Sequence, residues 1–295
     1  MKEIVTKSKI PVSLALGFFD SLHIVHRKII GGAIAYAQKN GCSSAVFTFK
    51  DNGISKLKGD MIYLYDERKD ILSRMGVDYL IPFVFDEKCI KTDKNDFLDM
   101  LTEMADIKAI FCGYDFSFGY KGEGNVDFLA SYCREKGIDL FVSEKETAYN
   151  EKISSSMIKQ FLLSGETEKA NELLIEPYSI ISEVIRGRGE GHVFGIPTAN
   201  ILMEDHKLLI KEGVYGTYTN INGKKYLSVT NVGKKPTFDD FTVSIETLIK
   251  DFDADIYGEI LKIEFIRFLR PVRKFDSKEE LRQQIFMDLT WEKNT

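Results

Sequence analysis

Residues 17–26 read Gly17-Phe-Phe-Asp-Ser-Leu-His-Ile-Val-His26, and they join a short apolar run, Val12–Leu16, to an amphipathic pattern that extends to Gln38. The run has the length and composition of a strand buried on both faces, and the pattern has the period of a helix. In parallel α/β sheets, ligands bind where the strands end, and the N-terminus of the following helix offers free N–H groups to anions. The stretch therefore predicts a parallel α/β sheet with an anion site close to residues 17–26.

The same alternation of strand and helix patterns continues to about residue 174. Four further apolar runs suit strands buried on both faces: Ser44–Phe49, Tyr79–Phe83, Ala109–Cys112 and Asp139–Val142. Helical patterns accompany them: His26–Gln38, Asp66–Met75, Asn95–Met104, Val126–Lys136, Ser154–Ser164 and Glu166–Leu174. Gly41, Gly76 and Gly137 stand where three of these helices should end. The alternation predicts a parallel sheet with helices on both faces.

Near Pro177 the pattern changes to the alternation of half-buried strands. Five runs show it: Tyr178–Arg186, Val214–Ile221, Lys225–Val232, Thr242–Ile249 and Ile260–Phe268. Asn222-Gly223 predicts a tight hairpin, because both turn positions require a positive φ. Ser277 and Glu280 form a capping-box pattern that begins a last helix. We expect two domains, residues 1–177 and 178–295, and we expect the second to be a small antiparallel β-barrel with a terminal helix.

Composition excludes several classes of function. The chain has 295 residues, with 40 Lys and Arg against 45 Asp and Glu, so its formal net charge is −5. A mildly acidic chain without basic clusters does not suit nucleic acid or an anionic membrane as a partner, and no apolar run reaches the roughly 18 residues of a spanning helix. The first twenty residues show no secretory pattern, and the four cysteines are scattered without metal-ligand spacing. We expect a cytoplasmic protein with reduced thiols and small-molecule partners.

Three segments of the first half could bind phosphate. His23 and His26 stand at a helix start, where they could present cationic or hydrogen-bonding edges to an anion. Asp115 lies in Gly113-Tyr-Asp-Phe-Ser-Phe-Gly119, directly after a strand, and Lys152-Ile-Ser-Ser-Ser-Met-Ile-Lys159 opens a later helix. The alternative for the histidines and serines is capping or packing, which is the default use of serine at a helix start. Together the three segments indicate a nucleotide phosphate site.

The second half has one dense polar motif, Arg186-Gly-Arg-Gly-Glu-Gly-His-Val-Phe-Gly-Ile-Pro-Thr-Ala-Asn200. Its four glycines could turn backbone N–H groups toward phosphates. Thr198 and Asn200 carry the neutral oxygens that suit a hard cation such as Mg²⁺. The alternative is a glycine loop that merely connects two strands, and the spacing leaves both readings open because it is not that of a Walker loop.

These motifs resemble the prokaryotic bifunctional riboflavin kinase/FMN adenylyltransferases, and the resemblance covers essentially the whole chain. Residues 17–26 are similar to the family's GxFDGxHxGH motif, 153–159 to its ISSTxIR motif, and 195–200 to the G-[FI]-P-T-A-N core of its flavokinase motif. The resemblance implies a Rossmann-type nucleotidylyltransferase-like domain followed by a riboflavin-kinase-like barrel. It also implies that ATP phosphorylates riboflavin to FMN with Mg²⁺ as cofactor, and that a second ATP converts FMN to FAD and pyrophosphate.

The resemblance also implies the site residues. Glu246 would be the catalytic base of the kinase, and His23 and His26 would be the catalytic residues of the adenylyltransferase. The remaining first-half positions would bind nucleotide or flavin: Gly17, Phe19, Asp20, Asp115, Lys152, Ser154, Ser155, Ser156 and Lys159. The second-half positions would bind ATP, with Thr198 and Asn200 also holding the metal: Gly187, Gly189, Gly191, Gly195, Pro197, Thr198 and Asn200.

The first half departs from the family pattern at several positions, among them Lys50-Asp-Asn-Gly53, where the family usually has Glu-Pro-His-Pro. Ser21 and Val25 replace glycines, and Lys159 replaces an arginine, so backbone access and a bidentate fork for phosphate are both lost. We therefore expect FAD formation to be slower than FMN formation. One alternative is a riboflavin kinase with a degenerate N-terminal domain. The other is a flavin-binding regulatory protein, which would have no need of the base Glu246.

Overall fold

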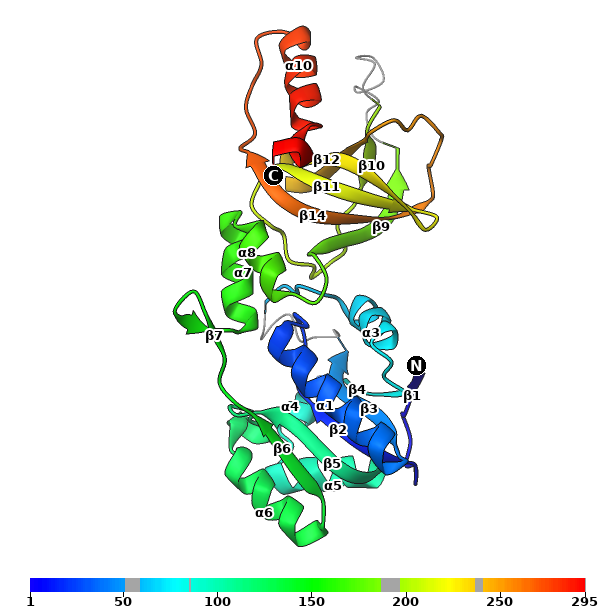
Figure 1. Cartoon of the computed structure of the whole chain (residues 1–295), viewed down its shortest axis with the longest axis vertical. Coiled ribbons are helices and arrows are strands. Elements are labelled where there is room, and N and C mark those ends of the chain that lie inside the picture. The colour runs from blue at the N-terminus through cyan, green and yellow to red at the C-terminus, as the bar shows by residue number, and fades with distance from the viewer. Residues whose placement is uncertain (51–58, 85, 187–196, 237–240, 295) are drawn as a thin grey trace. The chain divides into compact units, whose positions relative to one another are not determined.

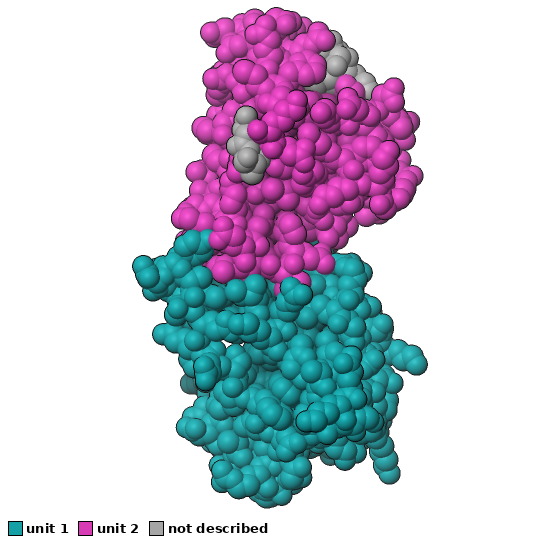
Figure 2. Space-filling view, viewed as in Figure 1, with its two compact units in different colours: residues 1–155 teal, residues 156–295 magenta. Residues whose placement is uncertain are grey.

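The computed structural model describes residues 1–50, 59–84, 86–186, 197–236 and 241–294 (Figure 1). These residues form two compact units, 1–155 and 156–295, which Figure 2 distinguishes by colour. Helix α7 (Ser155–Ser164), apart from its first residue, and helix α8 (Thr167–Leu173) belong to the second unit. We expect the boundary between independently folding domains at residue 177, and this boundary stays a prediction.

The first unit contains a six-stranded parallel sheet in the order β1-β4-β3-β2-β5-β6. Its strands are β1 (Lys2–Glu3), β2 (Pro11–Leu16), β3 (Ser43–Lys50), β4 (Tyr79–Val84), β5 (Asp106–Gly113) and β6 (Asp139–Ser143). Its helices are α1 (Ile24–Asn40), α3 (Tyr65–Arg74), α4 (Glu87–Ile90), α5 (Lys94–Met104) and α6 (Val126–Lys136), with a short 3₁₀ turn, η1 (Tyr120–Gly122). A two-stranded hairpin, β7 (Thr147–Ala148) and β8 (Glu151–Lys152), precedes α7. The predicted parallel α/β fold is confirmed.

The strand order reverses at β2, which pairs with β3 on one side and with β5 on the other. Helices cover both faces, as expected. Leu14 of β2 packs in a cluster with Leu98 of α5 and Leu129 of α6, while Phe111 of β5 lies against Gly32 of α1 on the other face. Ligands of such sheets bind at the point of reversal, so the carboxyl ends of β2 and β5 are where a site should be sought.

One prediction about the sheet is wrong. β6 does not have the expected burial on both faces, because it is an edge strand that pairs with β5 alone among the described strands. Phe141 and Val142 are 44% and 39% exposed. The apolar composition of a strand does not reveal whether the chain places it at the centre or the edge of its sheet.

The second unit contains a closed antiparallel barrel in the order β10-β13-β12-β11-β14-β9, which confirms the predicted small barrel. Its strands are β9 (Ser179–Ile185), β10 (Ala199–Ile201), β11 (Gly213–Ile221), β12 (Lys224–Pro236), β13 (Phe241–Ile249) and β14 (Ile260–Arg270). Asn222 and Gly223 take φ values of 48° and 79° in the predicted hairpin turn. The short strand β10, which closes the barrel against β9, was not predicted from the sequence.

The barrel interior is partly polar. Thr217 is hydrogen-bonded to Ser228 and to Thr230, each at 2.8 Å, and Thr230 continues the chain to Thr247 at 2.9 Å. All four side chains are fully buried. Because each hydroxyl has a partner, no buried polar group of this set is left unsatisfied. The hydrogen bonds also connect three adjacent strands, β11, β12 and β13.

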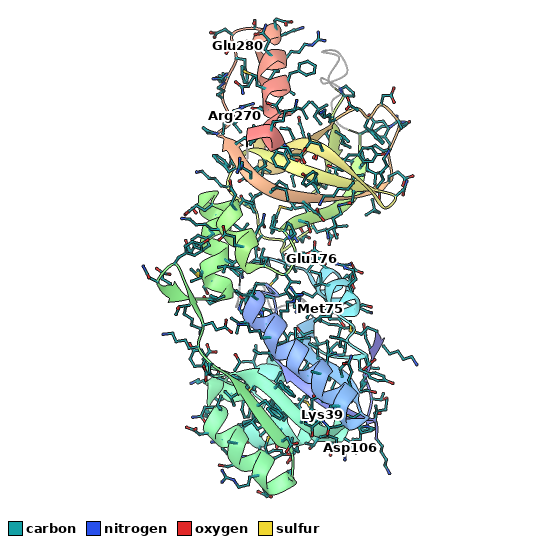
Figure 3. All side chains as sticks on the ribbon, viewed as in Figure 1. Lys39, Met75, Asp106, Glu176, Arg270 and Glu280 are labelled. Atoms are coloured by element: carbon teal, nitrogen blue, oxygen red, sulfur yellow. The ribbon has the colours of Figure 1, made fainter. Side chains whose placement is uncertain are left out.

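The terminal helix α10 (Lys278–Asp288) is fixed to the barrel at its C-terminal end. Arg270, labelled in Figure 3, donates from Nη2 to Asp288 Oδ2 at 2.8 Å, and the Trp291 indole donates to the carbonyl oxygen of Ser228 at 3.1 Å. Ser277 accepts from the Glu280 N–H at 3.1 Å, as the capping pattern predicts. Within the described part of the chain, no helix combines the length and the apolar character needed to span a membrane.

Candidate functional sites

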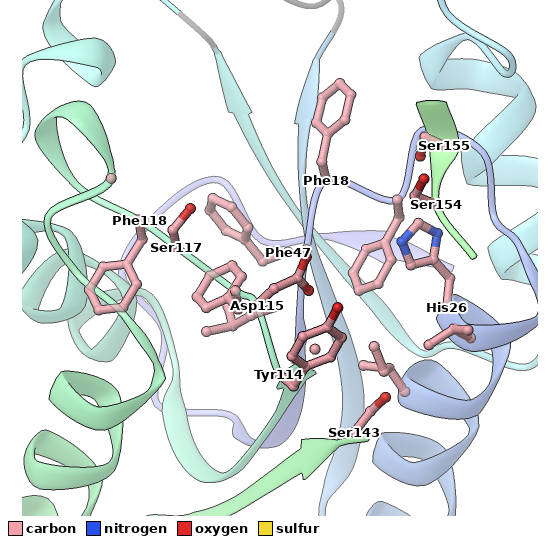
Figure 4. Close-up of a pocket in the computed structure, with 18 of the residues that line it drawn as sticks. Phe18, His26, Phe47, Tyr114, Asp115, Ser117, Phe118, Ser143, Ser154 and Ser155 are labelled. Carbon is pink, nitrogen blue, oxygen red and sulfur yellow. The ribbon is translucent and has the colours of Figure 1, made fainter. Parts of the chain in front are cut away.

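The first unit has a cavity of about 640 Å³ at the reversal point of its sheet (Figure 4). The turn after β2, the segment after β5, the end of β6 and the start of α7 form its walls. Eight aromatic residues line it: Phe18, Phe19, Phe47, Phe49, Phe97, Tyr114, Phe116 and Phe118. The predicted site residues Gly17, Phe19, His23, His26, Asp115, Lys152, Ser154 and Ser155 also line it. Tertiary structure thus brings three separate sequence segments to one cavity.

The turn after β2 has an unusual backbone. Phe19 and Leu22 have φ values of 54° and 42°, a region that bulky side chains rarely occupy. Gly17 has no room for a side chain, because a Cβ there would lie 2.7 Å from the ring of Phe19. The side chains of Phe19 and Leu22 are both buried. The turn is therefore held in its shape by the packing around it.

His23 is the N-cap of α1. Its Nδ1 accepts from the backbone N–H of His26 at 3.2 Å, so the proton of the neutral ring lies on Nε2. Burial lowers the pKa of His23 to about 4, against a smaller opposing effect from Asp20. Burial also lowers the pKa of His26 well below its usual value, and His23 adds to this effect.

The two imidazoles stack, with ring centroids 3.5 Å apart. The ring of His26 also meets Phe19 edge-on at 5.0 Å, and its buried Nδ1 has no hydrogen-bond partner among the described residues. The sequence leaves open whether His23 and His26 act as cations or as neutral hydrogen-bond donors. The lowered pKa values of both rings favour the neutral form. A neutral imidazole can polarise an anionic oxygen without the cost of burying a charge.

Ser155, the first residue of α7, links two segments of the cavity wall. Its hydroxyl donates to Asp20 Oδ1 and lies 2.9 Å from the hydroxyl of Ser21. Asp20 and Ser21 are both buried. Ser21, which departs from the family's glycine, thus takes part in a hydrogen bond that holds the turn to Ser155.

Lys152 and Asp115 form an ion pair at the cavity, and Lys152 also lies over the ring of Tyr114 at 5.2 Å. The hydrogen bond to Asp115 raises the pKa of Lys152. Figure 4 shows Asp115 and Tyr114 directed into the cavity. Ser156 and Lys159 lie in the second unit, and their part in this site remains a prediction.

The second unit has a row of polar residues on neighbouring barrel strands. Asn200 of β10 lies directly opposite Glu246 of β13, and Asn231 of β12 lies opposite Glu246 on its other side. Ser244 donates to Glu246 Oε1 at 3.0 Å. Because Thr247 points into the barrel, its neighbour Glu246 points outward. The row brings two predicted residues, Asn200 and Glu246, to one place on the outer surface.

Thr198 precedes Asn200 by two residues, with buried Ala199 between them, and Asn200 donates to the carbonyl oxygen of Thr198 at 3.5 Å. The exposed Pro197 begins this segment. The predicted phosphate-binding glycines Gly187, Gly189, Gly191 and Gly195 lie outside the described residues.

A second cavity, of about 310 Å³, lies between this side of the barrel and α10. Pro197, Leu227 and Leu248 line it from the barrel, and Ile285 and Phe286 line it from the helix. Leu248 and Glu246 are two residues apart on β13 and therefore share a face. The apolar cavity thus adjoins the polar row.

Two residues of these sites were missed by the sequence analysis. Asn231 belongs to the polar row only through strand register, and Arg68 contacts the turn after β2 from a helix about fifty residues away. Neither residue stands in a distinctive local pattern. A buried arginine in particular is not distinguishable by sequence from the exposed Arg74 of the same helix.

Comparison with known proteins identifies the class of protein to which this chain belongs. The family model for FAD synthetase matches residues 5–157, and the family model for riboflavin kinase matches residues 174–295. This chain is thus a flavin-nucleotide transferase with one family domain in each half. The chain belongs to the bifunctional riboflavin kinase/FMN adenylyltransferase family, as its motifs indicate.

The similarity to individual relatives extends over almost the whole chain. Bifunctional riboflavin kinase/FMN adenylyltransferases of Listeria monocytogenes and Bacillus subtilis are each 34% identical to it, and each alignment covers 93% of this chain and 89% of the relative. A crystal structure of a Streptococcus pneumoniae protein named macrolide-efflux protein has a TM-score of 0.87 at 28% identity and covers 98% of this chain and 96% of its own. The similarity to these proteins spans both units.

Proposed function

We propose that this chain phosphorylates riboflavin to FMN in its second half and adenylylates FMN to FAD in its first half. The observation that carries this proposal is that a riboflavin kinase domain and an FAD synthetase domain together match almost all of the chain. The geometry supports it, because each unit has its own cavity, with polar side chains lining the first and adjoining the second. Both cavities fall within the size range of small-molecule sites.

In the first half, a phosphate oxygen of FMN attacks the α-phosphorus of ATP, the bond to the bridging oxygen breaks, and pyrophosphate leaves. The neutral rings of His23 and His26 donate hydrogen bonds to the phosphate oxygens, where negative charge develops. Lys152 supplies a positive charge at the cavity wall. The aromatic residues that line the cavity suit the flavin ring, since large planar rings gain from stacking and apolar burial.

In the second half, the ribityl 5′-oxygen attacks the γ-phosphorus of ATP, ADP leaves, and Glu246 accepts the hydroxyl proton. The apolar cavity between Leu248 and α10 holds the flavin ring, which places the ribityl chain near Glu246 on the same strand. Ser244, which donates to Glu246 Oε1 at 3.0 Å, helps to orient the carboxylate.

Thr198 and Asn200 fit a hard cation, because hydroxyl and amide oxygens are neutral ligands that leave positions for phosphate oxygens and water. Among the described residues, no three His, Cys, Asp or Glu side chains form a metal cluster. Bound Mg²⁺ would neutralise charge on the ATP phosphates. Replacement of Asn200 by Ala should then raise the Mg²⁺ concentration needed for half-maximal kinase activity.

We also place this activity in the cytoplasm, with riboflavin, FMN and ATP as the partners of the chain. All four cysteines are free thiols, as in a reducing compartment. The net charge of −5 does not favour a nucleic-acid partner.

The test is incubation with riboflavin, ATP and Mg²⁺, followed over time by chromatography of FMN and FAD. We expect both products, with FAD formed more slowly than FMN. Formation of FMN alone would support a kinase with a degenerate first half. The absence of both products would favour a flavin-binding regulator. His26→Ala should abolish FAD formation and leave FMN formation intact, which assigns each activity to its own half.

A further inference from the structure

Arg68 of α3 is fully buried and lines neither of the two cavities. Its Nη1 donates to the carbonyl oxygen of Phe18 at 3.1 Å and to Thr48 Oγ1 at 2.7 Å, and its Nη2 donates to the carbonyl oxygen of Phe49 at 2.9 Å. The guanidinium also lies 5.4 Å from the ring centroid of Phe18 and 5.8 Å from that of Tyr65. Burying a permanent charge is costly, and these hydrogen bonds offset that cost. They fix the guanidinium of Arg68 to the cavity wall at Phe18 and Phe49.

The Phe18 carbonyl is held from two directions, because Thr48 Oγ1 also donates to it at 2.7 Å. This carbonyl belongs to the same peptide plane as the N–H of Phe19. In a trans peptide the C=O and N–H point in opposite directions, and the described backbone contains no cis peptide. The N–H of Phe19 therefore points away from Arg68.

The orientation of that plane also sets the φ of Phe19, which is 54°. A bulky residue in this region is strained and stays there only when its surroundings hold it. Without Arg68, only the Thr48 hydrogen bond would hold the Phe18 carbonyl, and the plane would rotate more readily toward a more favourable φ. The direction of the Phe19 N–H would then be less well fixed.

The Phe19 N–H has no hydrogen-bond partner among the described residues. Phe18 and Phe19 both line the 640 Å³ cavity, and Phe19 contacts the ring of His26. The direction of this N–H, away from an arginine that does not line the cavity, favours its use by a ligand beside the two histidines.

We propose that Arg68 is a positioning residue for adenylyl transfer, because it holds the Phe18 carbonyl and thereby directs the Phe19 N–H at a phosphate oxygen of the bound nucleotide. This inference rests on the proposed function of the first half. Arg68 itself touches no substrate. Its effect should appear in turnover, since a directed donor matters most when charge develops on the transferred phosphate.

The test compares Arg68→Met and Arg68→Lys with the parent chain. Arg68→Met removes the hydrogen-bonding fork, and we expect the kcat of FAD formation to fall by about 10²-fold, as for loss of a single oxyanion donor. Arg68→Lys keeps the charge but not the fork, and kcat should fall by at least about tenfold. Arg74→Met is the matched control, because Arg74 is a partly exposed arginine of the same helix, and it should leave both activities unchanged.

Two further readouts separate positioning from a general loss of structure. FMN formation in each variant should stay at the parent's rate, and the KM for ATP should change much less than kcat. A purely structural role would lower the Tm and the fraction of folded protein, while kcat per folded molecule stayed the same.

A folded Arg68→Met chain with kcat within threefold of the parent would overturn the inference. If Arg68→Met does not fold, Arg68→Lys decides, and parental turnover in that variant has the same consequence. A parent chain that makes no FAD at all would overturn the adenylyltransferase proposal and this inference together. An active parent with equally active variants would overturn this inference alone.

Discussion

The imidazole rings of His23 and His26 stack with their planes inclined by only 16°, and His23 caps the helix that carries His26. The cap requires an unprotonated Nδ1 on His23, so protonation there would break the hydrogen bond that begins α1. Two protonated rings at this distance would also repel each other. The pair is therefore stable only in its neutral form.

We expect the first unit to lose stability as the pH falls from about 6.5 to about 4. The pKa of His23 is about 4 in the folded chain, whereas an unfolded histidine has a pKa of about 6.5. The unfolded chain therefore binds more protons in this window, and each histidine contributes a loss of up to about 1.4 kcal/mol per pH unit. Above pH 6.5 this contribution is fully present.

Urea unfolding followed by circular dichroism at several pH values measures this effect. The double variant His23→Gln/His26→Gln should show a shallower dependence of stability on pH between 4 and 6.5. An equally steep dependence in that variant would show that other groups cause it.

Glu246→Gln should reduce kinase turnover by about 10²–10⁴-fold, the usual contribution of a positioned general base. The amide keeps the shape of the side chain but cannot accept the ribityl proton, so ATP binding should change little. Glu183→Gln is the control, since Glu183 is an exposed carboxylate on strand β9 of the same barrel. Turnover of Glu246→Gln within about threefold of the parent would remove Glu246 from the mechanism.

Val25→Gly should increase the rate of FAD formation. Val25 lines the first cavity from the first turn of α1, between the two histidines, and its side chain restricts the approach of phosphate to the backbone. Val126→Gly is the matched control, because Val126 also begins a helix but does not line the cavity. If folded Val25→Gly forms FAD no faster than the parent, crowding by Val25 does not limit the reaction.

Residues 178–295 alone should fold and phosphorylate riboflavin, and residues 156–295 should do so with a higher Tm. Helix α8 contributes the difference: the side chain of Asn171 donates to the carbonyl oxygen of Phe265 at 2.8 Å and accepts from the N–H of Tyr178 at 3.0 Å. Buried Leu173 adds roughly 1.5–3 kcal/mol. Thermal unfolding and a kinase assay of both fragments test this prediction. A folded, flavin-binding 178–295 fragment without kinase activity would show that the site needs more of the chain.

Local patterns in the sequence predict most of the helices and strands and the fold class of each half. Apolar periodicity predicts the parallel strands, the switch near Pro177 and the barrel strands, and the αL requirement at Asn222-Gly223 predicts the hairpin turn. These features are local, because backbone preference and side-chain spacing act over a few residues. The motifs at 17–26 and 195–200 are equally local, so the family is recognisable from them.

The placement and the charge state of the site residues follow from tertiary packing. The exposure of β6 depends on its edge position, and the partnership of Asn231 with Glu246 depends on strand register. The charge state of His23 depends on burial, and the contact of Arg68 with Phe18 joins residues 50 positions apart. Burial and long-range contacts arise only when distant segments pack together, and no pattern within one segment contains them.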